Sequence, residues 1–89
     1  MTIRRRVVVH GRVQGVFFRD SIRREASAAG VAGRAANRPD GTVEAVFEGD
    51  QAAVERLMAF CRRGPRRAEV SQVEVTEQEP EGLTGFAVR

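Results

Sequence analysis

The sequence contains no lysine, no tryptophan and no tyrosine, and it has one cysteine and one histidine. A single cysteine cannot form a disulfide within the chain or a zinc site built from cysteines, which favours the cytoplasm over an oxidising compartment. No apolar run approaches the roughly 20 residues of a transmembrane helix, and residues 1–10 contain too short an apolar stretch for a signal peptide. We therefore expect a cytoplasmic protein that binds no membrane.

Because lysine is absent, all 15 basic residues are arginine, and the formal net charge is +3. Arginine stays charged and its planar guanidinium matches phosphate groups, so a nucleic acid and a small phosphorylated molecule both fit as partners. Most arginines other than Arg19 are typical of a charged surface. At 89 residues, the chain is expected to form one domain, residues 1–89, around one core.

The hydrophobic pattern predicts strands that alternate with two helices. Strands are expected at Val7–Val9, Val31–Ala36, Val43–Phe47, Val70–Val75 and Phe86–Val88. The first helix has Asp20 in its first turn and ends at Gly30, and the second is capped by Asp50 and ends at Gly64. Residues 77–85 contain a proline and two glycines and are expected to form a mobile loop.

The order β-α-β-β-α-β followed by a short C-terminal strand is typical of the α+β, ferredoxin-like split βαβ sandwich, in which two helices cover one face of an antiparallel sheet. A right-handed crossover through the first helix makes the first two strands parallel, with the third between them. Asn37 opens a predicted turn over residues 37–41, at the end of the second strand. It is therefore expected beside the loop that follows the first strand, with about 10 Å between the two strand ends.

That loop has the features of a phosphate-binding site. It reads GRVQGVFFR over residues 11–19, and Gly15 can adopt backbone angles closed to other residues. Arg19 is placed where the helix begins, although a cation there is unfavourable unless an anion lies beside it. We expect a phosphoryl group to be bound by Arg19 and by the converging N–H groups of Gly15, Val16, Phe17 and Phe18.

Other residues with chemical potential are interpreted as structural. The rings of Phe17 and Phe18 are expected in the core beside the loop, and His10 is expected to be a strand residue without a catalytic partner. Cys61 and Arg67 have the spacing of cysteine-dependent phosphatases, but Cys61 falls on the apolar stripe of the second helix. We therefore interpret Cys61 as a small core residue rather than a nucleophile.

Two separated motifs carry a resemblance to a known family. They are GRVQGVFFR, which ends at Arg19, and Gly33-x-Ala35-Ala36-Asn37-x-x-x-Gly41-x-Val43 followed by Gly49, with Gly64-Pro65 and Phe86 further along the chain. Together they resemble the signatures of acylphosphatases, small enzymes that split carboxyl-phosphate anhydrides into a carboxylate and inorganic phosphate. Arg34 departs from the aromatic residue that the family usually has, and it points away from the face of Asn37, so we expect altered packing there rather than altered chemistry.

The resemblance implies the ferredoxin-like fold, with Arg19 and Asn37 as the catalytic residues. Arg19 and the loop N–H groups would hold the phosphoryl oxygens, and Asn37 would orient the attacking water. Phosphoryl transfer depends mostly on positioning and charge stabilisation, so no metal or cofactor is expected. The expected partner is a small-molecule acyl phosphate, not a nucleic acid, and the enzyme is expected to act as a monomer.

Two non-catalytic alternatives remain open. An RNA-binding module can share this sandwich, but its sheet then carries exposed aromatic residues. The sequence has five phenylalanines and no tyrosine or tryptophan. In addition, Glu44 and Glu48 would put negative charge on the face opposite the helices. The other alternative is a module that binds an acyl phosphate without hydrolysing it.

Overall fold

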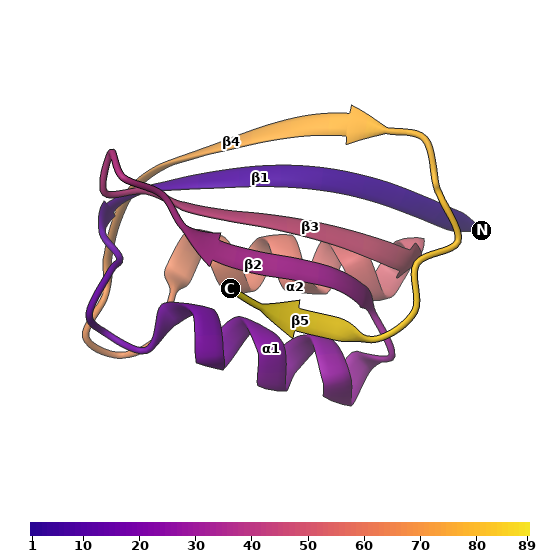
Figure 1. The fold of residues 1–89 in the computed structure, drawn as a ribbon, viewed down its shortest axis with the longest axis horizontal. Helices are drawn as coiled ribbons and strands as arrows, with labels where there is room; N and C mark the ends of the chain where they lie inside the picture. The colour runs from indigo at the N-terminus through magenta and orange to yellow at the C-terminus, as the bar shows by residue number, and fades with distance from the viewer.

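A five-stranded sheet with two helices on one of its faces accounts for the chain in the computed structural model, which describes residues 1–89 (Figure 1). The elements, in chain order, are β1 (Thr2–Arg12), α1 (Phe18–Ala29), β2 (Ala32–Asn37), β3 (Val43–Asp50), α2 (Gln51–Arg63), β4 (Glu69–Gln78) and β5 (Phe86–Val88). This order confirms the predicted ferredoxin-like pattern with a short final strand. No helix is both long enough and apolar enough to cross a membrane.

The strand order β4-β1-β3-β2-β5 places β3 between β1 and β2. Both β1 and β2 run antiparallel to β3, so they are parallel to each other, as predicted. The sheet is mixed rather than antiparallel throughout, because β5 pairs in parallel with β2, with Gly33 opposite Phe86. The chain leaves β4 at one edge and crosses to the other edge before β5 begins, which gives β5 this direction (Figure 1).

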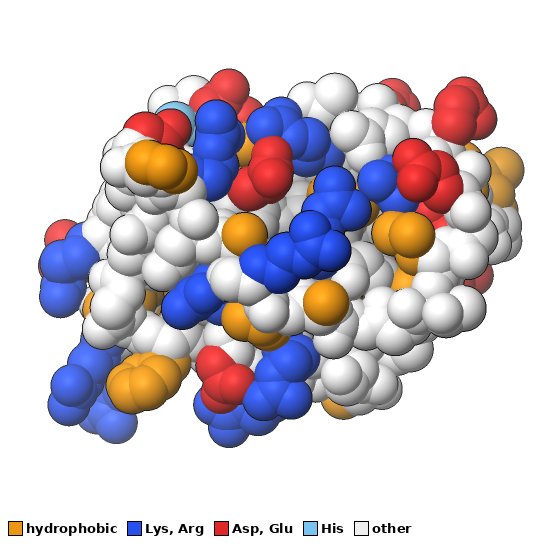
Figure 2. Space-filling view, in the orientation of Figure 1, with side chains coloured by type: hydrophobic (Ala, Val, Ile, Leu, Met, Phe, Trp, Pro, Cys, Tyr) orange, Lys and Arg blue, Asp and Glu red, His pale blue; other side chains and the backbone are white.

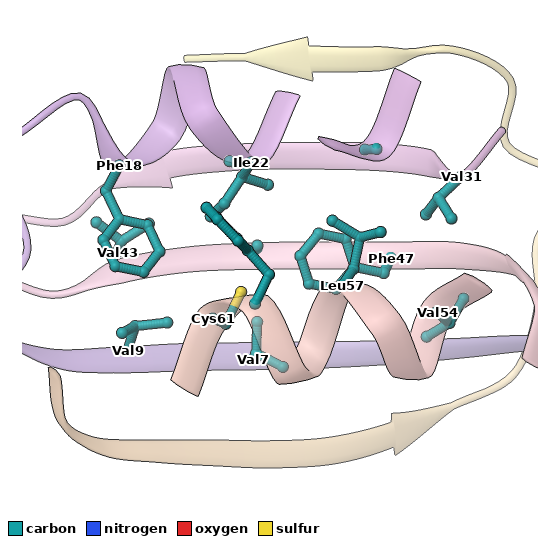
Figure 3. Close-up of a cluster of buried hydrophobic side chains, with 14 of the residues drawn as sticks. Val7, Val9, Phe18, Ile22, Val31, Val43, Phe47, Val54, Leu57 and Cys61 are labelled. Carbon is teal, nitrogen blue, oxygen red and sulfur yellow. The ribbon is translucent and has the colours of Figure 1, made fainter. Parts of the chain in front are cut away.

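The core lies between the helices and one face of the sheet (Figure 3). Alternate residues of β3 point towards the helices, and Val43, Ala45 and Phe47 are fully buried on that face, as predicted. The core also contains Val7 and Val9 of β1, Ile22 and Ala26 of α1, and Val54, Leu57 and Cys61 of α2. Burial of these apolar side chains fixes how α1 lies on the sheet and therefore where its first turn is.

The helix ends follow the sequence signals, with one exception. α1 ends at Gly30, with a φ of 70°, and α2 ends at Gly64, both as predicted. Asp50 precedes α2, but its carboxylate makes no capping hydrogen bond. It lies 3.6 Å from the amino group of Met1, and the main-chain oxygen of Met1 accepts the N–H of Gln51. Asp50 therefore lies at the expected position before α2, but its carboxylate pairs with the amino group of Met1 instead of capping the helix.

The face of the sheet away from the helices carries ion pairs between neighbouring strands. Arg6 Nη2 lies 2.6 Å from Glu44 Oε2, and Arg4 Nη1 lies 3.3 Å from Glu48 Oε1. Figure 2, which looks at the sheet with α2 behind it, shows arginine and acidic side chains next to one another on this face. The expected negative charges of Glu44 and Glu48 are present there, and arginines neutralise them.

Glu48 is only 3% exposed, and it anchors the crossing between β4 and β5. Its carboxylate accepts the N–H groups of Glu81, Gly82 and Leu83 at 2.8, 2.8 and 2.9 Å. The expectation of a mobile loop over residues 77–85 is therefore corrected: β4 continues to Gln78, and the middle of the crossing is bound to a buried side chain. No local pattern could reveal this, because Glu48 lies more than 30 residues earlier in the chain.

The surroundings of Glu48 keep its carboxylate charged. Burial alone raises the pKa of the Glu48 carboxyl, but the N–H groups of Glu81 and Leu83, the guanidinium of Arg4 and the N–H of Gly82 together outweigh burial and lower that pKa. A carboxyl group whose pKa is lowered by folding stabilises the fold above its unfolded pKa of about 4.3. This contribution is lost as the pH falls below that value towards the folded pKa.

Replacing Glu48 by Gln is expected to reduce the free energy of unfolding at neutral pH by about 3 kcal/mol, because the buried Arg4 then keeps only the exposed carboxylate of Glu81, 3.7 Å away, as a charged partner. Glu44→Gln is the matched control on the same strand, and its partly exposed ion pair with Arg6 should contribute less than about 1 kcal/mol. Unfolding in guanidinium chloride measures both losses. The gap between wild type and Glu48→Gln should narrow below about pH 4, and equal losses for the two variants at neutral pH would contradict this role of Glu48.

Candidate anion-binding site

A cavity of about 250 Å³ opens where the loop between β1 and α1 meets the ends of β2 and β5. It is lined by Val13, Gly15, Phe17, Phe18, Arg19, Asp20, Asn37 and Val88. The cavity thus brings together Arg19 and Asn37, as the predicted topology requires. All residues expected to present N–H groups line it except Val16, whose side chain packs into the core.

The β1–α1 loop presents a row of main-chain N–H groups that have no acceptor within the protein. Gly15 has a φ of 75° and Phe17 a φ of 61°, so two left-handed residues occur close together in this loop, a geometry that turns successive N–H groups to one side. The N–H groups of residues 15–20 donate to no protein oxygen, and the first bond of the helix runs from the N–H of Ser21 to Phe17 O at 3.0 Å. The positive end of α1 therefore lies at the cavity.

Arg19 is the second residue of α1, and no Asp or Glu side chain is paired with it. Its guanidinium donates a hydrogen bond to the main-chain oxygen of Arg89. The carboxylate of Asp20 is paired with Arg23 at 2.6 Å and with Arg24 at 3.4 Å, and the hydrogen bond from Arg23 lowers the pKa of Asp20. No acidic side chain therefore offsets the positive charge of Arg19 beside the positive end of the helix, and a bound anion would offset both.

Asn37 ends β2 and leads into a tight turn. The N–H of Arg38 donates to Thr42 O at 2.9 Å, and the N–H of Gly41 donates to Arg38 O at 3.1 Å. Asp40 accepts the hydroxyl and the N–H of Thr42 at 2.6 and 3.0 Å, and these bonds lower the pKa of Asp40. The predicted turn is confirmed, and the exposed carboxamide of Asn37 makes no hydrogen bond within the protein, so it can serve a ligand or water.

Gln14 joins the two halves of the site. Its Nε2 donates to the main-chain oxygens of Arg38, at 2.7 Å, and of Thr42, at 2.9 Å. Because Gln14 adjoins Gly15 and the turn adjoins Asn37, these bonds fix the loop and the turn relative to each other. Sequence reasoning assigned Gln14 no role, since its partners lie 24 and 28 residues further along the chain. Its place inside the GRVQG motif is the only signal that could have identified it.

The two phenylalanines of the loop differ in burial. Phe18 is 1% exposed and lies in the core, as predicted (Figure 3). Its ring is edge-on to that of Phe60, with a centroid distance of 6.3 Å. A Cβ on Gly64 would come within 2.8 Å of the Phe18 ring, so glycine is required there. Phe17 is 74% exposed, and the prediction that its ring lies in the core is wrong. It precedes the helix in a left-handed conformation and so does not share the buried face of α1.

Three other residues considered from the sequence lie away from the cavity. His10 is a residue of β1, as predicted, and its Nε2 contacts Glu74 of β4. Arg34 lies opposite Val46 in the sheet. Cys61 is fully buried in α2, and burial raises the pKa of its thiol to about 12, so the group stays protonated at neutral pH. No three His, Cys, Asp or Glu side chains come together as a metal-binding group.

Comparisons with known proteins agree on one family. The acylphosphatase family model matches residues 5–88. An acylphosphatase of Gloeobacter violaceus is 55% identical over 97% of this chain and 92% of its own length, and one of Rubrobacter xylanophilus is 57% identical over 99% of this chain and 81% of its own. The crystal structure of the acylphosphatase from Bacillus subtilis is 36% identical and has a TM-score of 0.94, over 100% of this chain and 99% of that one. The matched length includes both the loop and the turn that form the cavity.

The buried thiol generates a prediction about reactivity. The reaction is compared at a pH near the ordinary thiol pKa of about 8.5. At that pH, Cys61 in the folded protein should react with iodoacetamide about 10³-fold more slowly than in the unfolded chain, because the thiolate is the reactive form. Mass spectrometry of samples taken over time, with and without guanidinium chloride, measures the two rates. Equal rates would mean that Cys61 is reachable and ionised in the folded protein.

Proposed function

This chain belongs to the acylphosphatase family and hydrolyses acyl phosphates to a carboxylate and inorganic phosphate, and we propose that Arg19 and Asn37 are its catalytic residues. The observation that carries the proposal is that both side chains line one cavity together with the loop N–H groups. Neither side chain has a competing partner there apart from the main-chain oxygen that Arg19 contacts. Both are therefore available to a substrate.

The phosphoryl group is bound by the loop and by Arg19. The free N–H groups of residues 15–18 and the guanidinium supply donors to its oxygens, and charge-assisted bonds of this kind strengthen as negative charge develops. Binding of a dianion also removes the repulsion between Arg19 and the positive end of α1. Affinity for phosphate and stabilisation of the transition state thus come from the same groups.

Asn37 orients the attacking water. The water oxygen forms a bond to phosphorus, the bond between phosphorus and the bridging oxygen breaks, and the acyl group leaves as a carboxylate with the electron pair. A carboxylate is a stable leaving group, so no general acid is needed. Neither Arg19 nor Asn37 can accept a proton at neutral pH, and the proton of the water passes to a phosphoryl oxygen of the substrate.

Asp20 is the one carboxylate that lines the cavity, and its surroundings argue against a role as the base. Arg23 and Arg24 both hold its oxygens. The hydrogen bond from Arg23 lowers the pKa of Asp20, and a more acidic carboxyl group is a weaker proton acceptor. This supports proton transfer to the substrate itself.

We propose that residues 1–89 act as one monomeric domain in the cytoplasm on a small-molecule substrate, without nucleic acid. The free Cys61 thiol is buried, which suits a reducing compartment. Arg4 and Arg6 on the open sheet face are paired with Glu48 and Glu44 rather than free for an RNA backbone, and the exposed aromatic side chain is Phe17 at the cavity.

Arg19→Ala is expected to lower kcat/KM for acetyl phosphate by at least about 10³-fold and to weaken inhibition by inorganic phosphate, because it removes the main counter-charge of the transition state. Asn37→Ala should lower kcat by about 10²-fold with phosphate inhibition changed less than about threefold. Release of inorganic phosphate, followed with a chelator in excess, measures both.

The matched control is Arg56→Ala, which removes the same charge from an exposed position of α2 outside the cavity. It should leave kcat/KM within about twofold of wild type. Near-normal hydrolysis by a folded Arg19→Ala protein would overturn the assignment of the catalytic residues.

Gln14→Ala is expected to lower kcat by about 10- to 100-fold with little change in phosphate inhibition, because the turn that carries Asn37 loses two hydrogen bonds and small displacements of a reacting group are costly. Gln51→Ala, at an exposed position of α2, is the control for loss of a glutamine. A wild-type kcat in Gln14→Ala, or a loss confined to phosphate inhibition, would refute a positioning role for Gln14.

A further inference from the structure

Phe17 breaks two local rules at once. It is the one residue other than glycine with a positive φ, at 61°, and a bulky side chain in this region strains the backbone. The residue is 74% exposed, although an aromatic side chain of this size usually gains free energy from burial. Strain and exposure at a single residue next to a cavity point to a use outside the folded chain.

The left-handed backbone is explained by the loop, and the ring is not. A left-handed residue at this place helps to turn the N–H groups of the loop to one side, and glycine or asparagine would adopt that conformation at lower cost. The ring makes no contribution to the core, which already contains Phe18 at the adjacent position. A reason for phenylalanine at residue 17 has to come from what its ring can touch.

The ring shares the cavity lining with a second exposed apolar side chain. Val88 of β5 is 38% exposed and lines the same cavity, although it lies at the far end of the sequence. The remaining groups at the cavity include the loop N–H groups, Arg19 and Asn37, which are polar. The lining therefore offers two chemically different parts to one ligand, a set of phosphate donors and a pair of exposed apolar groups.

An acyl phosphate has the same two parts. Its phosphoryl dianion and its acyl group are joined through one bridging oxygen, so a phosphoryl group held by the loop keeps the acyl group within reach of a side chain of that loop. We propose, on the basis of the proposed function, that Phe17 and Val88 contact the acyl group and make the enzyme selective for acyl phosphates with a bulky apolar acyl group. Loss of apolar surface from water on both sides favours this contact.

The two substrates that test this are cyclohexanecarbonyl phosphate and acetyl phosphate. Both release aliphatic carboxylates of similar basicity, so their intrinsic reactivities are close and the ratio of their kcat/KM values reports contacts to the acyl group. Wild-type protein should prefer the cyclohexanecarbonyl substrate by about tenfold, a modest value because the contact lies at an open cavity and covers part of the ring. A ratio near one for the wild-type protein would overturn the proposal.

Three variants localise the effect. Phe17→Asn removes the ring but tolerates the left-handed backbone, and it should bring the ratio to within about twofold of one, whereas Phe17→Tyr should keep it. Val88→Thr removes apolar surface at nearly constant shape and should lower the ratio by about twofold to threefold. Val75→Thr is its matched control, since Val75 is 41% exposed on β4 and does not line the cavity. The ratio of the two kcat/KM values for Val75→Thr should equal the wild-type ratio.

Inhibition by inorganic phosphate separates a contact from a disturbed loop. Phe17→Asn should keep the inhibition constant within about threefold of wild type, because phosphate has no acyl group to lose contact with. Equal losses for both substrates with weakened phosphate inhibition would overturn the proposal, since the ring would then act only through the loop backbone. Failure of the underlying catalytic assignment would look different, because hydrolysis of acetyl phosphate would then survive Arg19→Ala.

Discussion

The guanidinium of Arg19 and the positive end of α1 meet at one cavity, and the repulsion between them favours a bound anion there. Arginine carries a permanent charge, so this repulsion is offset only by a group of opposite charge. The adjacent carboxylate does not relieve it, because Asp20 is bound by Arg23 and Arg24. An anion in the cavity would meet both the guanidinium and the unpaired N–H groups, and this electrostatic match supports the proposed binding of a phosphoryl group by the loop.

The sheet topology brings the turn that follows Asn37 to the same end of the sheet as the loop of residues 13–17. Because β3 lies between two parallel strands, the loop after β1 and the turn after β2 emerge at the same end of the sheet without any inserted element. Gln14 then fixes their separation with two hydrogen bonds to the turn. In the proposed mechanism, phosphate binding and water positioning belong to different segments whose relative position is set by buried strands, which suits a reaction that depends on orientation more than on proton transfer.

The features that could be predicted from the sequence are those that a short stretch of residues determines by itself. Gly15 and Gly30 were recognisable from their neighbours as left-handed positions, and the apolar alternation of β3 identified its buried face. The rules of sheet topology then predicted that Asn37 lies beside the loop that follows β1. Phe17 was wrongly assigned to the core because an apolar residue beside a buried one is ordinarily buried, and its left-handed backbone, which exposes it, leaves no mark on the sequence.

The remaining features depend on partners that are distant in the sequence, and the orientation of Arg19 is one of them. Its guanidinium bonds to the main-chain oxygen of Arg89, whose N–H donates to Ala35 O at 2.9 Å. β5 is only three residues long, so its own ladder bonds constrain it weakly, and the crossing that leads to it must be restrained for β5 to pair reliably with β2. Glu48 provides that restraint by binding residues 81–83. A buried carboxylate on the face of the sheet away from the helices therefore supports the geometry of the cavity through the last strand, although it does not line the cavity.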